Sequence, residues 1–158
     1  MQQGQVDINW TDKAEVTKFM DFFISRYISQ TFVSDNEIVL ILNILDNNLA
    51  QLLPSADTNR LLHVVENFLM PKFDHANKDV RKSVVLCLAE LKNIMNSAIG
   101  SGDYDRIAYD KLYTAIDANL SEGRIKLIDI YMQRKIIEKA QDTKVSSLPT
   151  KIENQTEN

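Results

Sequence analysis

The sequence has few of the residues that interrupt helices: four glycines and three prolines among 158 residues. No proline interrupts an apolar periodic segment, which favours long helices over a β-sandwich or barrel. The single cysteine, Cys87, excludes an internal disulfide. The sequence also lacks a basic-then-apolar leader and an apolar run of about 18 residues. These absences predict a reducing cytoplasmic or nuclear location and no membrane partner.

A basic excess is also missing, because 22 acidic residues outnumber 18 basic ones and give a formal charge of -4. Nucleic acid is therefore not an expected partner. With 44% hydrophobic residues, the chain suits one globular domain. We expect residues 1–10 to form a leader, residues 11–140 the domain, and the polar residues 141–158 a frayed or disordered tail.

The most informative segment, residues 75–95, has the pattern of a capped helix that is buried on more than one side. Asn77 is placed to cap its start, and Asp79 complements the positive end of the helix dipole. One face carries Val80, Val84, Leu88, Leu91 and Met95, with Val85, Leu86 and Cys87 beside it. This coverage exceeds what a single neighbouring helix requires, and it is typical of stacked helical repeats.

Five further helices are predicted over about residues 11–28, 34–54, 55–71, 103–120 and 121–140. A capping box, Ser34 to Glu37, opens the second of these helices. The run 38–42 inside it is also compatible with a buried strand. Residues expected to face inward are Val16, Phe19, Phe23, Tyr27, Ile38, Ile41, Leu42, Leu45, Leu49, Leu52, Leu61, Leu62, Val65, Phe68, Leu69, Ile107, Leu112, Tyr113, Ile116, Ile125, Ile128, Tyr131, Lys135 and Ile136.

These six helices pair naturally as three hairpins, with a period of about 35 to 45 residues per pair. That period lies in the range of helical repeats. The predicted fold is all-α, a fragment of an α-solenoid built from HEAT-like hairpins.

Two sequence blocks resemble the C-terminal domain of the CLASP family of microtubule-associated proteins. The first is His75-Ala-Asn-Lys-Asp-Val-Arg-Lys-Ser-Val-Val-Leu-Cys-Leu88, and the second is Gly123-Arg-Ile-Lys-Leu-Ile-Asp-Ile-Tyr-Met-Gln-Arg134. Together they tie about residues 60–137 to the family. The resemblance implies a helical domain, related to the tubulin-binding TOG arrays, that recruits kinetochore, spindle or plus-end adaptor proteins. It also implies a location on the cytoskeleton, spindle or kinetochore.

Two features of the sequence make direct tubulin capture the weaker implication of this resemblance. A complete TOG array has about six hairpins, and this chain has room for about three. No tryptophan lies in a predicted loop within a repeat, because Trp10 precedes the first helix. Direct tubulin binding and homodimerisation remain the alternative functions.

Candidate partner-binding residues are basic and lie near two predicted loops: Lys78, Arg81, Lys82, Arg124 and Lys126. Arg81 also fits the Asp-x-Arg pattern of such repeats, in which the guanidinium bridges to a neighbouring hairpin. In the last helix, Arg124, Lys126, Arg134, Lys135 and Lys139 are expected to form a basic exposed face. An aromatic cluster of Phe19, Phe22 and Phe23 is the candidate surface for self-association.

The sequence predicts no enzyme, cofactor or metal site. Cys87 lies among apolar residues, where burial raises a thiol pKa and prevents nucleophilic chemistry. His63 and His75 have no cysteine or carboxylate at ligand spacing, and His63 is expected on a helix surface. Asp103 and Asp105 resemble the start of a calcium loop whose glycine and final glutamate are missing.

Overall fold

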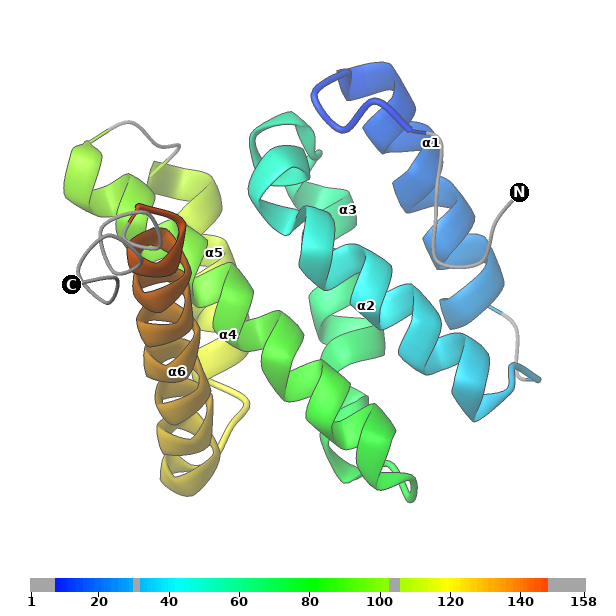
Figure 1. Ribbon diagram of the computed structural model, residues 1–158. Helices are drawn as coiled ribbons and strands as arrows, with labels where there is room; N and C mark the ends of the chain where they lie inside the picture. The colour runs from blue at the N-terminus through cyan, green and yellow to red at the C-terminus, as the bar shows by residue number, and fades with distance from the viewer. Residues whose placement is uncertain (1–7, 30–31, 103–105, 148–158) are drawn as a thin grey trace, which may run out of the picture.

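The computed structural model of the chain describes residues 8–29, 32–102 and 106–147, which are helical with no strand (Figure 1). The strand alternative for residues 38–42 is therefore wrong. The α-helices are α1 (Lys13–Phe23), α2 (Asp35–Leu52), α3 (Thr58–Val64), α4 (Lys78–Ser101), α5 (Arg106–Asp117) and α6 (Glu122–Ser147). Shorter turns are π-helical at η1 (Ile24–Ile28) and η3 (Val65–Leu69), and 3-10 at η2 (Leu53–Ser55) and η4 (Met70–Asp74).

Side-chain caps fix the first turns of these helices. The Asn77 side-chain oxygen accepts hydrogen bonds from the backbone of Asp79 at 2.8 Å and Val80 at 3.3 Å. The hydroxyl of Ser34 accepts one from the backbone of Glu37 at 3.2 Å. Each cap satisfies amide donors that have no partner within the helix, so the helix starts follow from local sequence, as predicted.

Consecutive helices alternate between two rows. In one row α4 lies between α2 and α6, and these are the most extensive contacts between elements. In the other row α3 contacts both α1 and α5. Figure 1 shows α2, α4 and α6 side by side, with α3 and α5 behind them.

The core is continuous through α4, as its sequence pattern predicted. Val80, Val84, Leu88, Leu91 and Met95 are all at most 1% exposed, and Val85 and Cys87 are buried beside them. On α2, all six apolar residues predicted to face inward are also buried. By length and composition, the segment Asp35–Ser55 would be long and apolar enough to cross a membrane, but most of its large apolar side chains belong to this core.

The third helix is not one continuous α-helix. After α3, the backbone N–H of Val65 bonds to the carbonyls of both Leu61 and Leu62, and the chain widens into the π turn η3. The extra residue in this turn changes which side chains face inward, so Val64, Val65, Phe68 and Leu69 are all buried. Leu62 is only half-buried.

An aromatic ladder extends the core to residue Trp10. Its ring packs edge-to-face on Phe19 at 4.9 Å between centroids, and Phe23 packs in the same way on Phe68 at 4.8 Å. Trp10 is 7% exposed. The predicted leader boundary is therefore wrong at Trp10, which belongs to the packed domain because burial of its large ring is favourable; residues 1–7 lie outside the described residues.

Three other predictions at the C-terminal end are wrong. The helix α6 continues to Ser147, past the boundary predicted at residue 141. Ile107 is 71% exposed, because α5 faces inward through Ala108, Leu112, Ala115 and Ile116. Ile136 is 42% exposed, because α6 faces inward through Ile128, Met132 and the ion-paired Lys135.

We predict that Leu88→Ala lowers the free energy of unfolding by about 2–5 kcal/mol, because it opens a cavity in a packed core. Leu40→Ala, at a position 40% exposed on α2, is the matched control and should cost less than about 1 kcal/mol. Urea denaturation followed by circular dichroism measures both. Equal losses for the two variants would contradict the central position of α4.

Candidate protein-interaction surface

The N-termini of α2, α4 and α6 meet along one edge of the molecule. Contacts of Asp35, at the start of α2, with His75 and Asn77 join the first two. An ion pair between Asp74 and Arg124 joins the loop before α4 to the first turn of α6. We call the described residues 32–34, 74–77 and 118–121, with the two helical turns that follow each loop, the loop edge.

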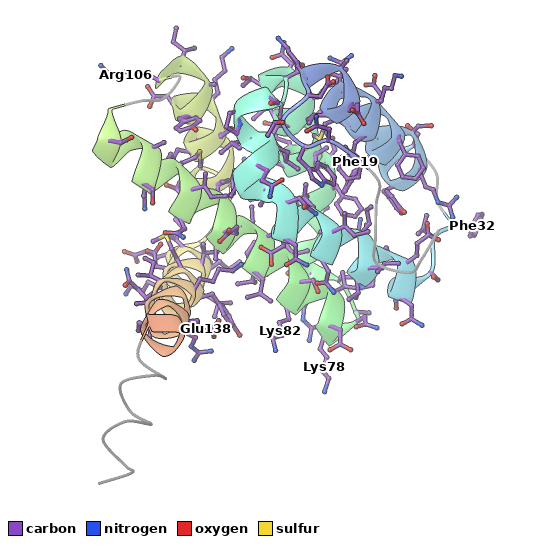
Figure 2. All side chains as sticks on the ribbon, turned by 45° about the horizontal axis from the view of Figure 1, so that its top comes forward. Phe19, Phe32, Lys78, Lys82, Arg106 and Glu138 are labelled. Carbon is purple, nitrogen blue, oxygen red and sulfur yellow. The ribbon has the colours of Figure 1, made fainter. Side chains whose placement is uncertain are left out.

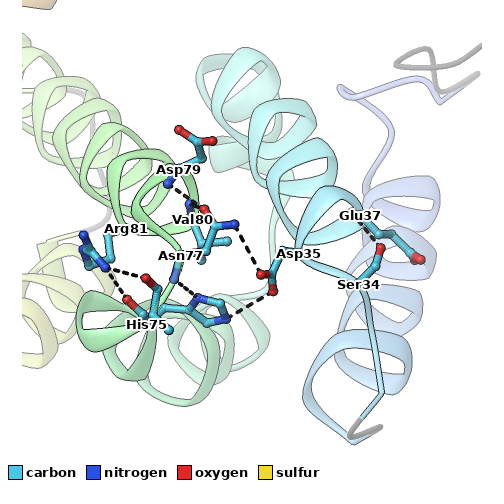
Figure 3. A network of polar contacts seen from close by, with 9 residues as sticks. Ser34, Asp35, Glu37, His75, Asn77, Asp79, Val80 and Arg81 are labelled. Carbon is cyan, nitrogen blue, oxygen red and sulfur yellow. Dashed lines mark hydrogen bonds and ion pairs between the residues drawn. The ribbon is translucent and has the colours of Figure 1, made fainter.

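The loop before α4 is held by a polar network (Figure 3). His75 accepts a hydrogen bond from the backbone of Asn77 through Nδ1 at 3.0 Å, and its Nε2 lies 3.5 Å from Asp35 Oδ1. The Asn77 amide donates to Asp35 Oδ2 at 3.3 Å. Because His75 contacts both helix starts, it acts as a brace between α2 and α4.

Arg81 completes this loop through hydrogen bonds to its carbonyl groups. Its Nη1 donates to the carbonyls of His75 at 2.7 Å and Ala76 at 3.0 Å. The expectation that Arg81 bridges to a neighbouring hairpin is therefore wrong, since its guanidinium satisfies carbonyl groups of its own loop.

Arg124 is also engaged within the domain. Besides the ion pair with Asp74, its guanidinium lies 5.3 Å from the centroid of the Phe73 ring. The hydrogen bond from Arg124 lowers the pKa of Asp74. Lys78, Lys82 and Lys126 differ, because all three are exposed and form no ion pair within the described part of the chain. Among the predicted contact residues, these three lysines could bind a partner without breaking an ion pair within the described part of the chain.

The first loop of the edge carries an aromatic residue that sequence reasoning missed. Phe32 is 94% exposed, just before the capping residue Ser34 (Figure 2). The sequence signal that could have identified Phe32 is an aromatic residue between the end of one predicted helix and the capping box of the next. Arg26 anchors the following turn through bonds of 2.6 and 2.8 Å to Glu37.

A charged cluster lies where α2, α4 and α6 meet. Lys135 Nζ is 2.8 Å from Asp46 Oδ1 and 3.6 Å from Glu90 Oε1, and the three side chains are 16%, 17% and 8% exposed. Lys135 therefore is not part of an exposed basic face, although the inward position predicted for it is confirmed. Arg134 is exposed on the same helix, and the Lys139 side chain lies outside the described residues.

Only one member of the predicted self-association cluster is on the surface. Phe19 is 5% exposed and Phe23 is fully buried, whereas Phe22 is 50% exposed. The two buried rings cannot contact another molecule without unfolding α1. Phe22 packs edge-to-face on Tyr27 with its centroid 6.0 Å away, so self-association through this helix would depend on Phe22 alone.

Cys87 has the properties of a core residue. Its thiol donates to the Leu42 carbonyl at 3.3 Å, and burial, followed by the charge of Asp46, raises its pKa well above the usual value. His63 is exposed, as predicted. The segment 103–105, considered above as a calcium loop, lies outside the described residues. In the described ranges, no group of three His, Cys, Asp or Glu residues could hold a metal ion.

Searches of protein-family models, curated proteins and solved structures found no match to this chain. A functional proposal therefore depends on the chemistry of the loop edge and on the sequence blocks described above.

We predict that Glu37→Gln removes an acid-sensitive part of the stability. Hydrogen bonds from Arg26, and then from Tyr27, lower the pKa of Glu37 from its ordinary value of 4.5. A lowered folded-state pKa stabilises the fold above pH 4.5 and loses this effect as the pH falls through the folded pKa. The gap in Tm between wild type and Glu37→Gln should therefore shrink on acidification below pH 4.5.

Differential scanning calorimetry across this pH range tests the prediction. The exposed Glu66→Gln variant is the control and should follow the wild-type curve. A Tm gap that stays constant with pH would contradict the role of the Arg26–Glu37 pair.

The self-association hypothesis predicts that Phe22→Glu halves the mass of the chain in solution, from a dimer to the 18.1 kDa monomer. A buried carboxylate at the dimer contact would be costly to desolvate. Light scattering at matched concentration measures the mass, with the exposed Ile137→Glu as control. Monomers for both wild type and Phe22→Glu would reject homodimerisation through α1.

Proposed function

We propose that this chain is a non-enzymatic, HEAT-like protein-interaction domain of a CLASP-like microtubule-associated protein. In this proposal it recruits kinetochore, spindle or plus-end adaptor proteins on the cytoskeleton. The chemistry of the domain is limited to recognition.

The alternating rows of helices support the HEAT-like part of this proposal. In stacked hairpin repeats, the second helix of each unit is buried between its partner and the neighbouring units. The helix α4 has such surroundings, since it packs between α2 and α6 and also contacts η4. Consecutive pairs α1–α2, α3–α4 and α5–α6 would be the three repeats.

The observation that carries the proposal is the loop edge. It gathers the exposed aromatic Phe32 and the available lysines Lys78, Lys82 and Lys126 on loops that are braced by their own polar groups. A braced surface loses little conformational entropy on binding. Exposed lysines increase the rate of encounter with an acidic partner, and an aromatic side chain supplies apolar contact area.

A second candidate function is direct binding of tubulin through the same edge. The favouring observation is Phe32, because an almost fully exposed aromatic ring in the first loop provides the apolar contact that the sequence pattern lacked. The lysines would then face the acidic surface of the polymer.

We expect a fluorescently tagged chain in dividing cells to concentrate on the spindle or kinetochores, and Lys78→Glu/Lys126→Glu to abolish this localisation by charge repulsion. The control is Lys18→Glu/Lys111→Glu, with the same change in charge on exposed lysines of α1 and α5. Diffuse wild-type fluorescence, or localisation unaffected by the loop-edge variant, would refute the proposal.

Co-sedimentation with purified microtubules at physiological salt separates the two candidates. An adaptor-recruiting domain stays in the supernatant. A tubulin-binding domain enters the pellet, and Phe32→Ser should then reduce its affinity by about tenfold, the cost of about 1.4 kcal/mol in lost contact.

A further inference from the structure

A groove of about 400 Å3 lies where α6 crosses the face formed by α2 and α4. It is open to solvent on one side, and it is distinct from the loops themselves. Its walls are formed by Asp46 of α2, by Lys82 and Leu86 of α4, and by Tyr131, Arg134, Lys135 and Glu138 of α6.

The floor of the groove holds one cation between two carboxylates. Lys135 bonds to Asp46 at 2.8 Å and lies 3.6 Å from Glu90. These contacts tie α6 to both neighbouring helices, so the floor is held in place before any ligand arrives. Both carboxylates contact Lys135 and are less exposed than Lys82, Arg134 and Glu138, which form the mouth of the groove.

The walls combine an apolar strip with cationic groups on either side. Leu86 and Tyr131 are half-buried, and the Arg134 guanidinium lies 5.1 Å from the centroid of the Tyr131 ring. Lys82 lies on the opposite wall. An apolar ligand group resting on Leu86 and Tyr131 would therefore have a positive charge on each side.

The spacing along the two helices extends this pattern beyond one turn. On α4, Lys78, Lys82 and Leu86 recur every four residues and share one face. On α6, Tyr131, Arg134 and Glu138 recur at three and four residues. Figure 2 shows Lys78 and Lys82 on the same side of the molecule, with Glu138 on the neighbouring α6. Lys78 therefore lies one helical turn beyond Lys82, on the side of the loop edge.

The charges at the mouth favour an acidic ligand. Lys78, Lys82 and Arg134 form no ion pair with any residue in the described ranges. Among the exposed residues that line the groove, the cations Lys82 and Arg134 outnumber the one carboxylate, Glu138. This local excess of positive charge stands out on a chain whose formal charge is -4, so charge complementarity selects an acidic partner.

We propose that this groove binds an acidic amphipathic helix of a partner protein, with apolar side chains on Leu86 and Tyr131 and carboxylates facing Lys82 and Arg134. A helix fits because the walls are themselves helix faces, and its apolar stripe at three- and four-residue spacing matches the strip between them. This assignment rests on the proposed function, since it names the site and the chemistry of the recruited partner.

The test uses the purified full chain and a displayed library of random 16-residue peptides. Enriched sequences are expected to carry aspartate or glutamate beside apolar residues at helical spacing. A synthetic copy of an enriched peptide should bind at least about tenfold more weakly to Lys82→Glu/Arg134→Glu in fluorescence anisotropy, and more weakly to wild type as salt increases. Lys18→Glu/Lys111→Glu is the control and should bind like wild type.

Two checks separate a loss of peptide binding from a loss of folding. Circular dichroism verifies that each variant is folded, and Lys82→Gln/Arg134→Gln removes the charges without adding carboxylates near Asp46. This neutral variant should also weaken binding, by less than the charge reversal does.

Enrichment of basic or uncharged peptides, or equal affinity in the groove variants and wild type, would overturn the proposal. A wild-type dimer that Lys82→Glu/Arg134→Glu converts to a monomer would instead identify a second copy of the chain as the occupant. The peptide assay does not depend on cellular localisation. A chain that binds acidic helices but never reaches the spindle refutes the proposed function alone, and a spindle-localised chain without peptide binding refutes the groove alone.

Discussion

Burial of α4 on several sides is the constraint on which the rest of the structure depends. Val84 and Leu88 are fully buried, and each would expose apolar surface if the helices packed around α4 were displaced. The helix also holds α5 through Lys92, whose Nζ lies 2.8 Å from Asp117 Oδ1 while its side chain is only 6% exposed. Because α4 contacts α2 and α6 and is joined to α5 by this ion pair, its packing sets how these helices lie relative to one another.

The position of the loop edge follows from this packing. Because α2, α4 and α6 lie in one row with their N-termini at the same end, their capping loops meet. The polar groups of these loops are then used locally, as Arg81 and His75 illustrate. Phe32, Lys78, Lys82 and Lys126 stay exposed beside these braced loops, and the proposed recognition would use them.

Much of the helical architecture could be predicted because its signals are local. The caps at Ser34 and Asn77 act within three residues, and the apolar stripes of α2 and α4 repeat at helical spacing. The candidate site was harder to predict. Lys78, Lys82 and Lys126 are exposed as expected, but Arg81 and Arg124 are engaged through carbonyl and carboxylate groups that pattern reasoning could not place beside them.

Local sequence is enough to predict that the described chain is helical, where its helices begin, and that α4 is buried on more than one side, because capping and periodicity act over a few residues. Packing between distant segments, in contrast, pairs Lys135 with Asp46, brings Trp10 into the core, and leaves Ile107 and Ile136 facing solvent. These outcomes depend on partners far away in the chain. The groove between α4 and α6 also depends on distant parts of the chain, since its walls are adjacent only after the rows have packed.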